Sequence, residues 1–317
     1  ALLGLYPCFI SSTMRKLLPF FIISSPSPVA PAAPILLSTY KPDPIIGLSP
    51  TRPCNLYLRP LVELPPARIP TPAVPRRRLC DPGLTFADDT LSAIRADHDR
   101  LIARHPEFRD YCPSVLAYEL SFLNYARIPD ILNMVEQVLG PDFALWNSSF
   151  FAKPALNGRA TPWHQDGEYW PIRPVATCTV WMAIDSATMA NGCLRIVRGS
   201  HREKRLLQHQ TNPRKDLTLN QELLPSEFDE SKAVNLELEA GQISLHDVFL
   251  VHGSEANTTA QARRGMTLRY MPTASVFDRE LAVRQGQKMG FLNHSNRTLY
   301  LMRGIDQSGK NDFRMRL

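Results

Sequence analysis

The sequence predicts a mainly β protein with flanking helices, built as a barrel or as a double-sheet jelly roll. Three observations predict this class. Apolar residues recur at helical spacing between residues 86 and 140, their spacing falls to about two between residues 143 and 273, and Gly, Asn and Pro separate the segments of that second region. Helices followed by antiparallel-type strands are typical of a β core with a helical cover.

Two amphipathic helices are expected before the strands begin. In "FADDTLSAIRADHDRLIARHPEF" (86–108), apolar residues such as Leu91, Ile94 and Leu101 follow an Asp/Thr start at helical spacing. The segment "IPDILNMVEQVLG" (128–140) has the same spacing and closes on Gly140. His98 and His105 fall in the first helical region, where surface or packing roles are the ordinary ones.

The strand region is rich in β-branched and aromatic residues. We expect strands at 143–153, 177–185, 193–199, 233–241, 242–253 and 265–272. The segment 202–232 is polar and has no period, so we expect a loop or short helices over one end of the β core. The domain would then comprise residues 79–317, with a helical part at 86–140 and a jelly-roll core at 143–273.

Residues 1–78 differ from the rest and predict a Pro-rich, basic extension. Sixteen of the 28 prolines lie there, and proline blocks the interiors of helices and sheets. The stretch "MRKLLPFFIISS" (14–25) resembles a weak signal or transit peptide, and its apolar run is too short to span a bilayer. We therefore expect no stable membrane insertion.

The charge distribution argues against a nucleic-acid-binding protein, and the cysteine spacing argues against a fold held by disulfides or structural zinc. The net charge of +6 comes from residues 1–78, which carry +7, whereas residues 79–317 carry −1. Without a basic patch in the globular part, we expect no nucleic-acid partner. The six cysteines form no C-x-x-C pair, which predicts neither a disulfide framework nor a structural zinc site.

The stretch "ATPWHQDGEYWP" (160–171) places His164 and Asp166 two residues apart. On a strand these two side chains point to the same face and Gln165 points to the other. An imidazole and a carboxylate held this way could bind a divalent metal or act as an acid/base pair. A polar stripe on a solvated strand would have the same pattern.

A mononuclear iron site uses two histidines and one carboxylate, so a further histidine must come from a distant strand. Of the chain's eight histidines, His246 and His252 lie together in one expected strand. Both positions have the same parity. Spacing alone therefore does not choose between them.

Three motifs in order resemble the phytanoyl-CoA dioxygenase family of Fe(II)/2-oxoglutarate oxygenases. They are "WHQD" (163–166), "TVWMAIDSATMANGCLRIVRGSH" (179–201) and "HGSEANTTAQARR" (252–264). The resemblance covers about 79–317 and is strongest over 143–273. It implies a double-stranded β-helix of the cupin-like, jelly-roll type.

The resemblance also implies a role for each matching residue. The implied iron ligands are His164, Asp166 and His252. Arg263 would pair with the distal carboxylate of 2-oxoglutarate, because a planar guanidinium meets a carboxylate with two parallel hydrogen bonds. Arg264 and Arg269 are its rivals, and Arg269 shares its parity. Further co-substrate contacts are expected from Ser254 and Trp181, and as weaker candidates from Lys153 and Ser149.

The implied activity is that of a dioxygenase that hydroxylates a C–H bond of a small organic substrate. Iron(II), 2-oxoglutarate and O2 would take part, succinate and CO2 would form, and ascorbate is a candidate addition. Because Asp166 supplies the carboxylate that related halogenases lack, hydroxylation is expected instead of halogenation. The alternatives are a non-catalytic jelly-roll protein that binds small molecules and retains the metal pocket, and a cupin-type isomerase or hydrolase.

The primary substrate, the oligomeric state and the compartment are not legible in the sequence. Arg173 or Arg195 could receive an anionic substrate, and Trp170 and the segment 202–232 are expected to shape the pocket. The final residues "RMRL" differ from a peroxisomal S-K-L signal, so the cytoplasm is the default expectation.

Overall fold

The structure is a computed structural model that describes residues 85–289 and 293–316. The predicted extension at 1–78, the transit-like segment at 14–25 and the domain boundary at 78/79 lie outside the described residues. None of the helices in the described ranges combines the length and the apolarity that crossing a bilayer requires.

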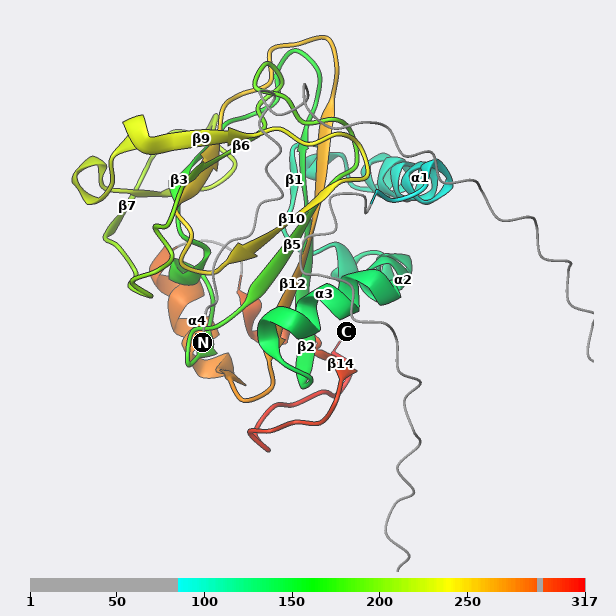
Figure 1. The fold of residues 1–317 in the computed structure, drawn as a ribbon, viewed down its shortest axis with the longest axis vertical. Coiled ribbons are helices and arrows are strands. Elements are labelled where there is room, and N and C mark those ends of the chain that lie inside the picture. Colours follow the sequence, from blue (N-terminus) through cyan, green and yellow to red (C-terminus); the bar gives the residue numbers. More distant parts are fainter. Residues whose placement is uncertain (1–84, 290–292, 317) are drawn as a thin grey trace, which may run out of the picture. The chain divides into compact units, whose positions relative to one another are not determined.

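The described chain is mainly β, with helices near both of its ends (Figure 1). The helices are α1 (Asp88–Arg104), α2 (Leu123–Ala126), α3 (Pro129–Leu139) and α4 (Arg279–Met289). The strands are β1 (Tyr111–Cys112), β2 (Phe143–Lys153), β3 (Thr161–His164), β4 (Ile172–Arg173), β5 (Cys178–Ala183), β6 (Leu194–Val197), β7 (His209–Thr211), β8 (Gln221–Leu223), β9 (Ala233–Leu236), β10 (Ile243–Asp247), β11 (His252–Ser254), β12 (Arg263–Pro272), β13 (Val276–Phe277) and β14 (Tyr300–Arg303).

The predicted fold class is confirmed in its double-sheet form. A six-stranded sheet has the order β1-β2-β12-β5-β10, with β14 also on β2, and a four-stranded sheet has the order β3-β11-β6-β9. The pairs in both sheets are antiparallel. The described residues contain no closed barrel.

Alternation along β12 gives the six-stranded sheet two different faces. Met266, Leu268 and Tyr270 point into the main hydrophobic core. Arg263 and Arg269 lie on the other face and line a cavity instead. The sheet is therefore apolar toward the helices and polar toward the second sheet.

Helices α1 and α3 cover the apolar face and lie beside the sheet in Figure 1. Both begin with groups that suit a helix N-terminus: Asp88 and Asp89 in α1, and Pro129 at the first position of α3. Helix α3 ends at Leu139 and is followed by Gly140, whose φ of +86° is one that glycine adopts without steric cost. The two predicted helices are thus present, each trimmed at its ends.

The expected strand 242–253 is wrong, because the chain changes sheets within it. Strand β10 ends at Asp247 in the six-stranded sheet, and β11 begins at His252 in the four-stranded sheet. Residues 248–251 make the crossing. His246 and His252 therefore belong to different sheets. Their shared parity along the chain does not tell whether their side chains point the same way.

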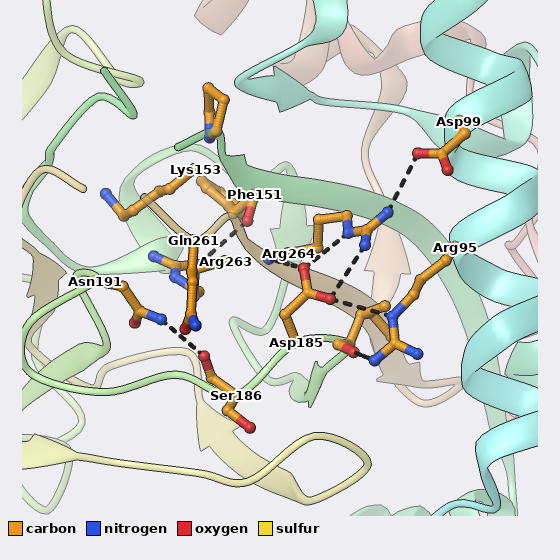
Figure 2. A network of polar contacts seen from close by, with 12 residues as sticks. Arg95, Asp99, Phe151, Lys153, Asp185, Ser186, Asn191, Gln261, Arg263 and Arg264 are labelled. Atoms are coloured by element: carbon orange, nitrogen blue, oxygen red, sulfur yellow. Dashed lines mark hydrogen bonds and ion pairs between the residues drawn. The ribbon is translucent and has the colours of Figure 1, made fainter. Parts of the chain in front are cut away.

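A network of ion pairs ties α1 to the sheet at Asp185, the residue two positions after β5 (Figure 2). Its carboxylate accepts from Arg95 Nε at 3.1 Å and from Arg264 Nε at 2.8 Å. The backbone N–H of Arg264 also donates to it, at 3.0 Å. Arg264 reaches Asp99 of α1 as well, at 3.2 Å. Arg264 is therefore fully engaged on the helical side of the sheet.

Removing the charge of Asp185 should loosen this network. We expect Asp185→Asn to lower the free energy of unfolding at pH 7 by about 1–3 kcal/mol, because several charge-assisted hydrogen bonds weaken together. Urea denaturation measures the change. Glu280→Gln is the control, since that side chain is 89% exposed and its loss should cost less than about 0.5 kcal/mol.

The same variant should show a defined pH dependence. Burial raises the pKa of Asp185, but its hydrogen bonds with Arg264 and the charge of Arg264 outweigh burial, so the folded pKa lies below the ordinary 3.8. A carboxyl group whose pKa is lowered on folding stabilises the folded protein at pH values above its ordinary pKa. This stabilisation is lost as the pH falls through the folded-state pKa. The stability gap between wild type and Asp185→Asn should therefore narrow in acid; a constant gap would contradict the network.

Candidate metal centre

Pairing of β3 with β11 brings two histidines face to face. His164 is the register partner of His252, and their ring centroids lie 4.2 Å apart. Asp166 follows closely, with its Oδ1 atom 3.7 Å from His164 Nε2. One ligand atom from each of the three residues lies within 4.8 Å of the others, and all three side chains are buried. The structure thus brings together the three residues that the sequence singled out.

Gln165 holds the turn between the two ligands from the opposite side. Its backbone is extended, and a 3₁₀ turn begins at Asp166, so the alternation expected of a strand persists through residue 166. The Gln165 side chain donates to the Phe249 carbonyl and accepts from Leu207 N–H, each at 2.7 Å. His209 Nε2 accepts from Gln165 N–H at 3.1 Å. This positioning contact was not predicted, since His209 lies in the polar segment 202–232, whose sequence offers no signal of it.

Both candidate histidine ligands are oriented by carbonyl groups two residues before them. Nδ1 of His164 lies 2.8 Å from the Pro162 oxygen, and Nδ1 of His252 lies 2.9 Å from the Leu250 oxygen. A carbonyl only accepts, so each Nδ1 is the protonated nitrogen that donates. Nε2 of each ring is left with the lone pair that a metal requires.

Burial and charge set the protonation states that metal binding needs. Burial lowers the pKa of His252 to about 3, which keeps its ring neutral at pH 7. Burial raises the pKa of Asp166, but its polar neighbours outweigh burial, with the Arg269 guanidinium as the permanent positive charge among them, and bring that pKa below 3.8. The site therefore presents a carboxylate anion beside a neutral imidazole.

A cavity of about 30 Å³ adjoins the three residues and is lined also by Arg263, Ser254 and Trp181. Arg263 is 2% exposed. Its guanidinium donates to the Phe151 carbonyl at 3.2 Å and to the Gly192 carbonyl at 2.7 Å, while Nε has no partner. Burial lowers its pKa to about 10, so it remains a cation at neutral pH. This arrangement places the buried positive charge of Arg263 on the cavity wall, which Arg269 also lines.

Gly265 explains how Trp181 reaches the same wall. A Cβ atom at Gly265 would lie 2.3 Å from the Trp181 ring, far inside contact distance. The missing side chain lets the indole approach the backbone of β12 closely. Its ring centroid is then 5.6 Å from the Arg263 guanidinium carbon, within the range of a cation–π contact.

The weaker co-substrate candidates, Lys153 and Ser149, do not line this cavity. They lie next to Arg263 and Arg269 instead. Lys153 lies opposite Arg263 on β2 and donates to the Arg159 carbonyl. Burial, with the charge of Arg263, lowers the pKa of Lys153 to about 6. Ser149 Oγ accepts from Arg269.

The alternative histidine, His246, lines the cavity from β10 without joining the three. Its Nε2 lies 2.9 Å from Ser244 Oγ, and its ring centroid is 5.9 Å from that of His252. Of these two histidines, His252 is the one that lies with His164 and Asp166.

A larger cavity of about 600 Å³ opens beside the small one. The two cavities share Phe151, Asp166 and Arg269 in their walls. Residues 211–215 and 217–220 form another wall of this cavity. They belong to the segment 202–232, for which a loop or short helices were expected; the structure adds the antiparallel pair β7–β8 there. The structure therefore joins a candidate metal site to a space large enough for a small organic molecule.

Solved structures with the same fold include non-heme oxygenases. The apo form of the non-heme monooxygenase ThoJ matches with a TM-score of 0.57 and 23% identity, over 73% of this chain and 82% of that one. The epimerase SnoN matches with a TM-score of 0.50 and 20% identity, over 61% and 78%. At these identities the matches establish the fold.

The curated proteins with similar sequences include several that are named phytanoyl-CoA dioxygenases. A probable phytanoyl-CoA dioxygenase of Caenorhabditis elegans is 31% identical over 155 residues, 46% of this chain and 49% of that protein. The human peroxisomal phytanoyl-CoA dioxygenase is 28% identical over 197 residues, 59% of this chain and 55% of that protein. The chain spans about half the length of the curated relatives it matches.

The family model for phytanoyl-CoA dioxygenase matches residues 83–265. That range covers more than half of the chain and includes His164, Asp166, His252 and Arg263. The chain belongs to the phytanoyl-CoA dioxygenase family.

Proposed function

We propose that the chain is an Fe(II)/2-oxoglutarate-dependent dioxygenase that hydroxylates an unactivated C–H bond of a small organic substrate. The observation that carries the proposal is the convergence of His164, Asp166 and His252 within 4.8 Å, at a buried cavity that Arg263 also lines. Family membership supports it, as does the shared fold with SnoN, which was solved with Fe3+ and alpha ketoglutarate.

The donor set fits iron(II). Two imidazoles with free Nε2 lone pairs and one carboxylate occupy three coordination positions and leave others for small molecules. A structural zinc site would be closed by four protein ligands, whereas the cluster found in the described residues has three. When bound, iron(II) couples the reduction of O2 to the oxidation of 2-oxoglutarate to succinate and CO2 and of the substrate to its hydroxylated product.

Arg263 is the residue that we assign to the distal carboxylate of 2-oxoglutarate. It is buried, its hydrogen-bond partners are neutral carbonyl groups, and no ion pair joins it to a carboxylate within the described ranges. A buried cation without a counter-ion is costly, and an incoming carboxylate offsets that cost. Trp181 and Ser254 complete the wall on which the diacid would lie.

Asp166 directs the reaction toward hydroxylation. Its carboxylate takes the third protein position, so no position is vacated for a halide ion. Tyr169 and Trp170, three and four positions after it, are buried and line the larger cavity, where they would keep water away from the reacting centre. O2 is the second co-substrate in this proposal, and ascorbate is the reductant to include in assays.

Truncating Asp166 tests the metal assignment. We expect Asp166→Ala to weaken Fe(II) binding roughly 100-fold or more and to abolish succinate formation, because one of three ligands is lost. Anaerobic equilibrium dialysis measures binding, and circular dichroism checks the fold. Asp229→Ala removes a carboxylate from an exposed turn and should leave both properties unchanged. Persistent turnover by Asp166→Ala would remove Asp166 from the ligand set.

Neighbouring arginines on β12 provide a matched test of co-substrate binding. Arg263→Gln should weaken 2-oxoglutarate binding roughly 10- to 100-fold, since a charge-assisted pair is lost. Arg264→Gln changes the adjacent residue, which points to the helical side, and should reduce stability but not 2-oxoglutarate affinity. The visible charge-transfer band of the anaerobic Fe(II)/2-oxoglutarate complex reports the affinity.

The same assays separate the enzyme from the alternative function. Equal losses in the two arginine variants would contradict the assignment of Arg263. Tight 2-oxoglutarate binding without succinate in air, across a substrate screen, would instead favour a non-catalytic protein that retains the metal pocket.

A further inference from the structure

Arg269 is a buried cation in the wall of the larger cavity, and the proposed reaction assigns it no role. Arg269 lines both cavities and is 4% exposed. Its Nη1 donates to Ser149 Oγ, and its Nε has no partner. No ion pair joins it to a carboxylate in the part of the chain that the structure describes. A charge buried in this state is costly unless an anion arrives to offset it.

Aromatic rings hold this guanidinium in place. Its carbon lies 5.1 Å from the Trp170 ring centroid and 5.9 Å from that of Phe151. With one nitrogen on Ser149 and rings nearby, the group is oriented before any ligand binds. A preorganised planar fork of this kind recognises a carboxylate with two hydrogen bonds.

Three arginines of β12 have distinct surroundings. Arg264 points to the helical side, where Asp185 and Asp99 neutralise it (Figure 2). Arg263 lies on the other side, where it donates to the Phe151 carbonyl. It lines the small cavity but not the large one. Arg269 shares that face and also borders the large cavity. Arg269 is thus the unneutralised arginine that a molecule in the large cavity meets.

The remaining charges of the large cavity favour an anion as well. Besides Arg269, its charged wall residues are Asp166, Arg214 and Lys215. Asp166 is committed to the metal in the proposed function, and Arg214 is paired with Asp216. Apolar and aromatic residues cover much of the remaining wall: Tyr111, Phe151, Tyr169, Trp170, Leu217 and Leu219.

We propose that the primary substrate is an amphipathic carboxylic acid whose carboxylate binds Arg269, with its hydrocarbon or aromatic body against the apolar wall of the large cavity. This inference rests on the proposed function for the identity of the site, but the binding step requires no turnover. Arg173 and Arg195, which the sequence offered as anion receivers, line neither the large nor the small cavity. Arg195 is instead paired with Glu230 and Glu255.

Matched acid and amide probes test the proposal by binding alone. The probes are 3-phenylpropanoate, decanoate and their primary amides, which share shape but differ in charge. Equilibrium dialysis is performed without oxygen on the full chain loaded with Fe(II) and 2-oxoglutarate, and again on the metal-free chain. Wild type should bind at least one acid about tenfold or more tightly than its amide.

Three variants assign the preference to Arg269. Arg269→Gln should abolish the preference for the acid, and Arg269→Lys should retain part of it because the charge remains. Arg284→Gln removes an exposed charge from α4 and should keep the full preference. In Arg269→Gln, the 2-oxoglutarate affinity should stay within about threefold of wild type, which shows that the fold and the co-substrate site are intact.

Several outcomes would overturn the proposal. These are equal binding of acids and amides by wild type, an undiminished preference in Arg269→Gln, and failure of both acids to bind. A large loss of 2-oxoglutarate affinity in Arg269→Gln would reassign Arg269 to the co-substrate. If the acid preference depends on Arg269 but no succinate forms, the proposed oxygenase activity is contradicted. The anion site is then still supported.

Discussion

The antiparallel pairing of β3 with β11 is the constraint on which the site depends. It sets His164 opposite His252, although the two residues are far apart in sequence, and Asp166 follows where β3 gives way to a turn. A shift of one residue in this register would turn one imidazole away from the other. Hydrogen bonds of Gln165 help to hold this register, because they fasten the turn to Phe249 and to Leu207.

The six-stranded sheet contributes positive charge to the cavity walls, whereas the four-stranded sheet contributes the two candidate histidine ligands. Because β12 alternates, it buries Met266 and Leu268 under the helices and directs Arg263 and Arg269 toward the cavities. Arg264 ties the same strand to α1 through Asp185. One strand therefore secures the helical cover and also supplies two buried cations to the cavity walls.

Much of the site could be predicted because short motifs report on local chemistry. The H-x-D spacing identified His164 and Asp166, and the context of His252 separated it from His246. The crossing at residues 248–251 was not predictable from parity, since a strand that changes sheets keeps its apolar pattern. Two further contacts were not predicted: that of His209 with Gln165, and the place of Arg269 in the wall of the larger cavity. Neither is visible in the sequence, because only the tertiary structure creates it.

The most direct measurement of the central claim is a crystal structure of the chain with Fe(II) and 2-oxoglutarate, grown without oxygen. The account predicts one metal ion bonded to Nε2 of His164, a carboxylate oxygen of Asp166 and Nε2 of His252. It also predicts the distal carboxylate of 2-oxoglutarate on Arg263. Iron held by other residues, or a diacid bound away from Arg263 with these three side chains unligated, would contradict it.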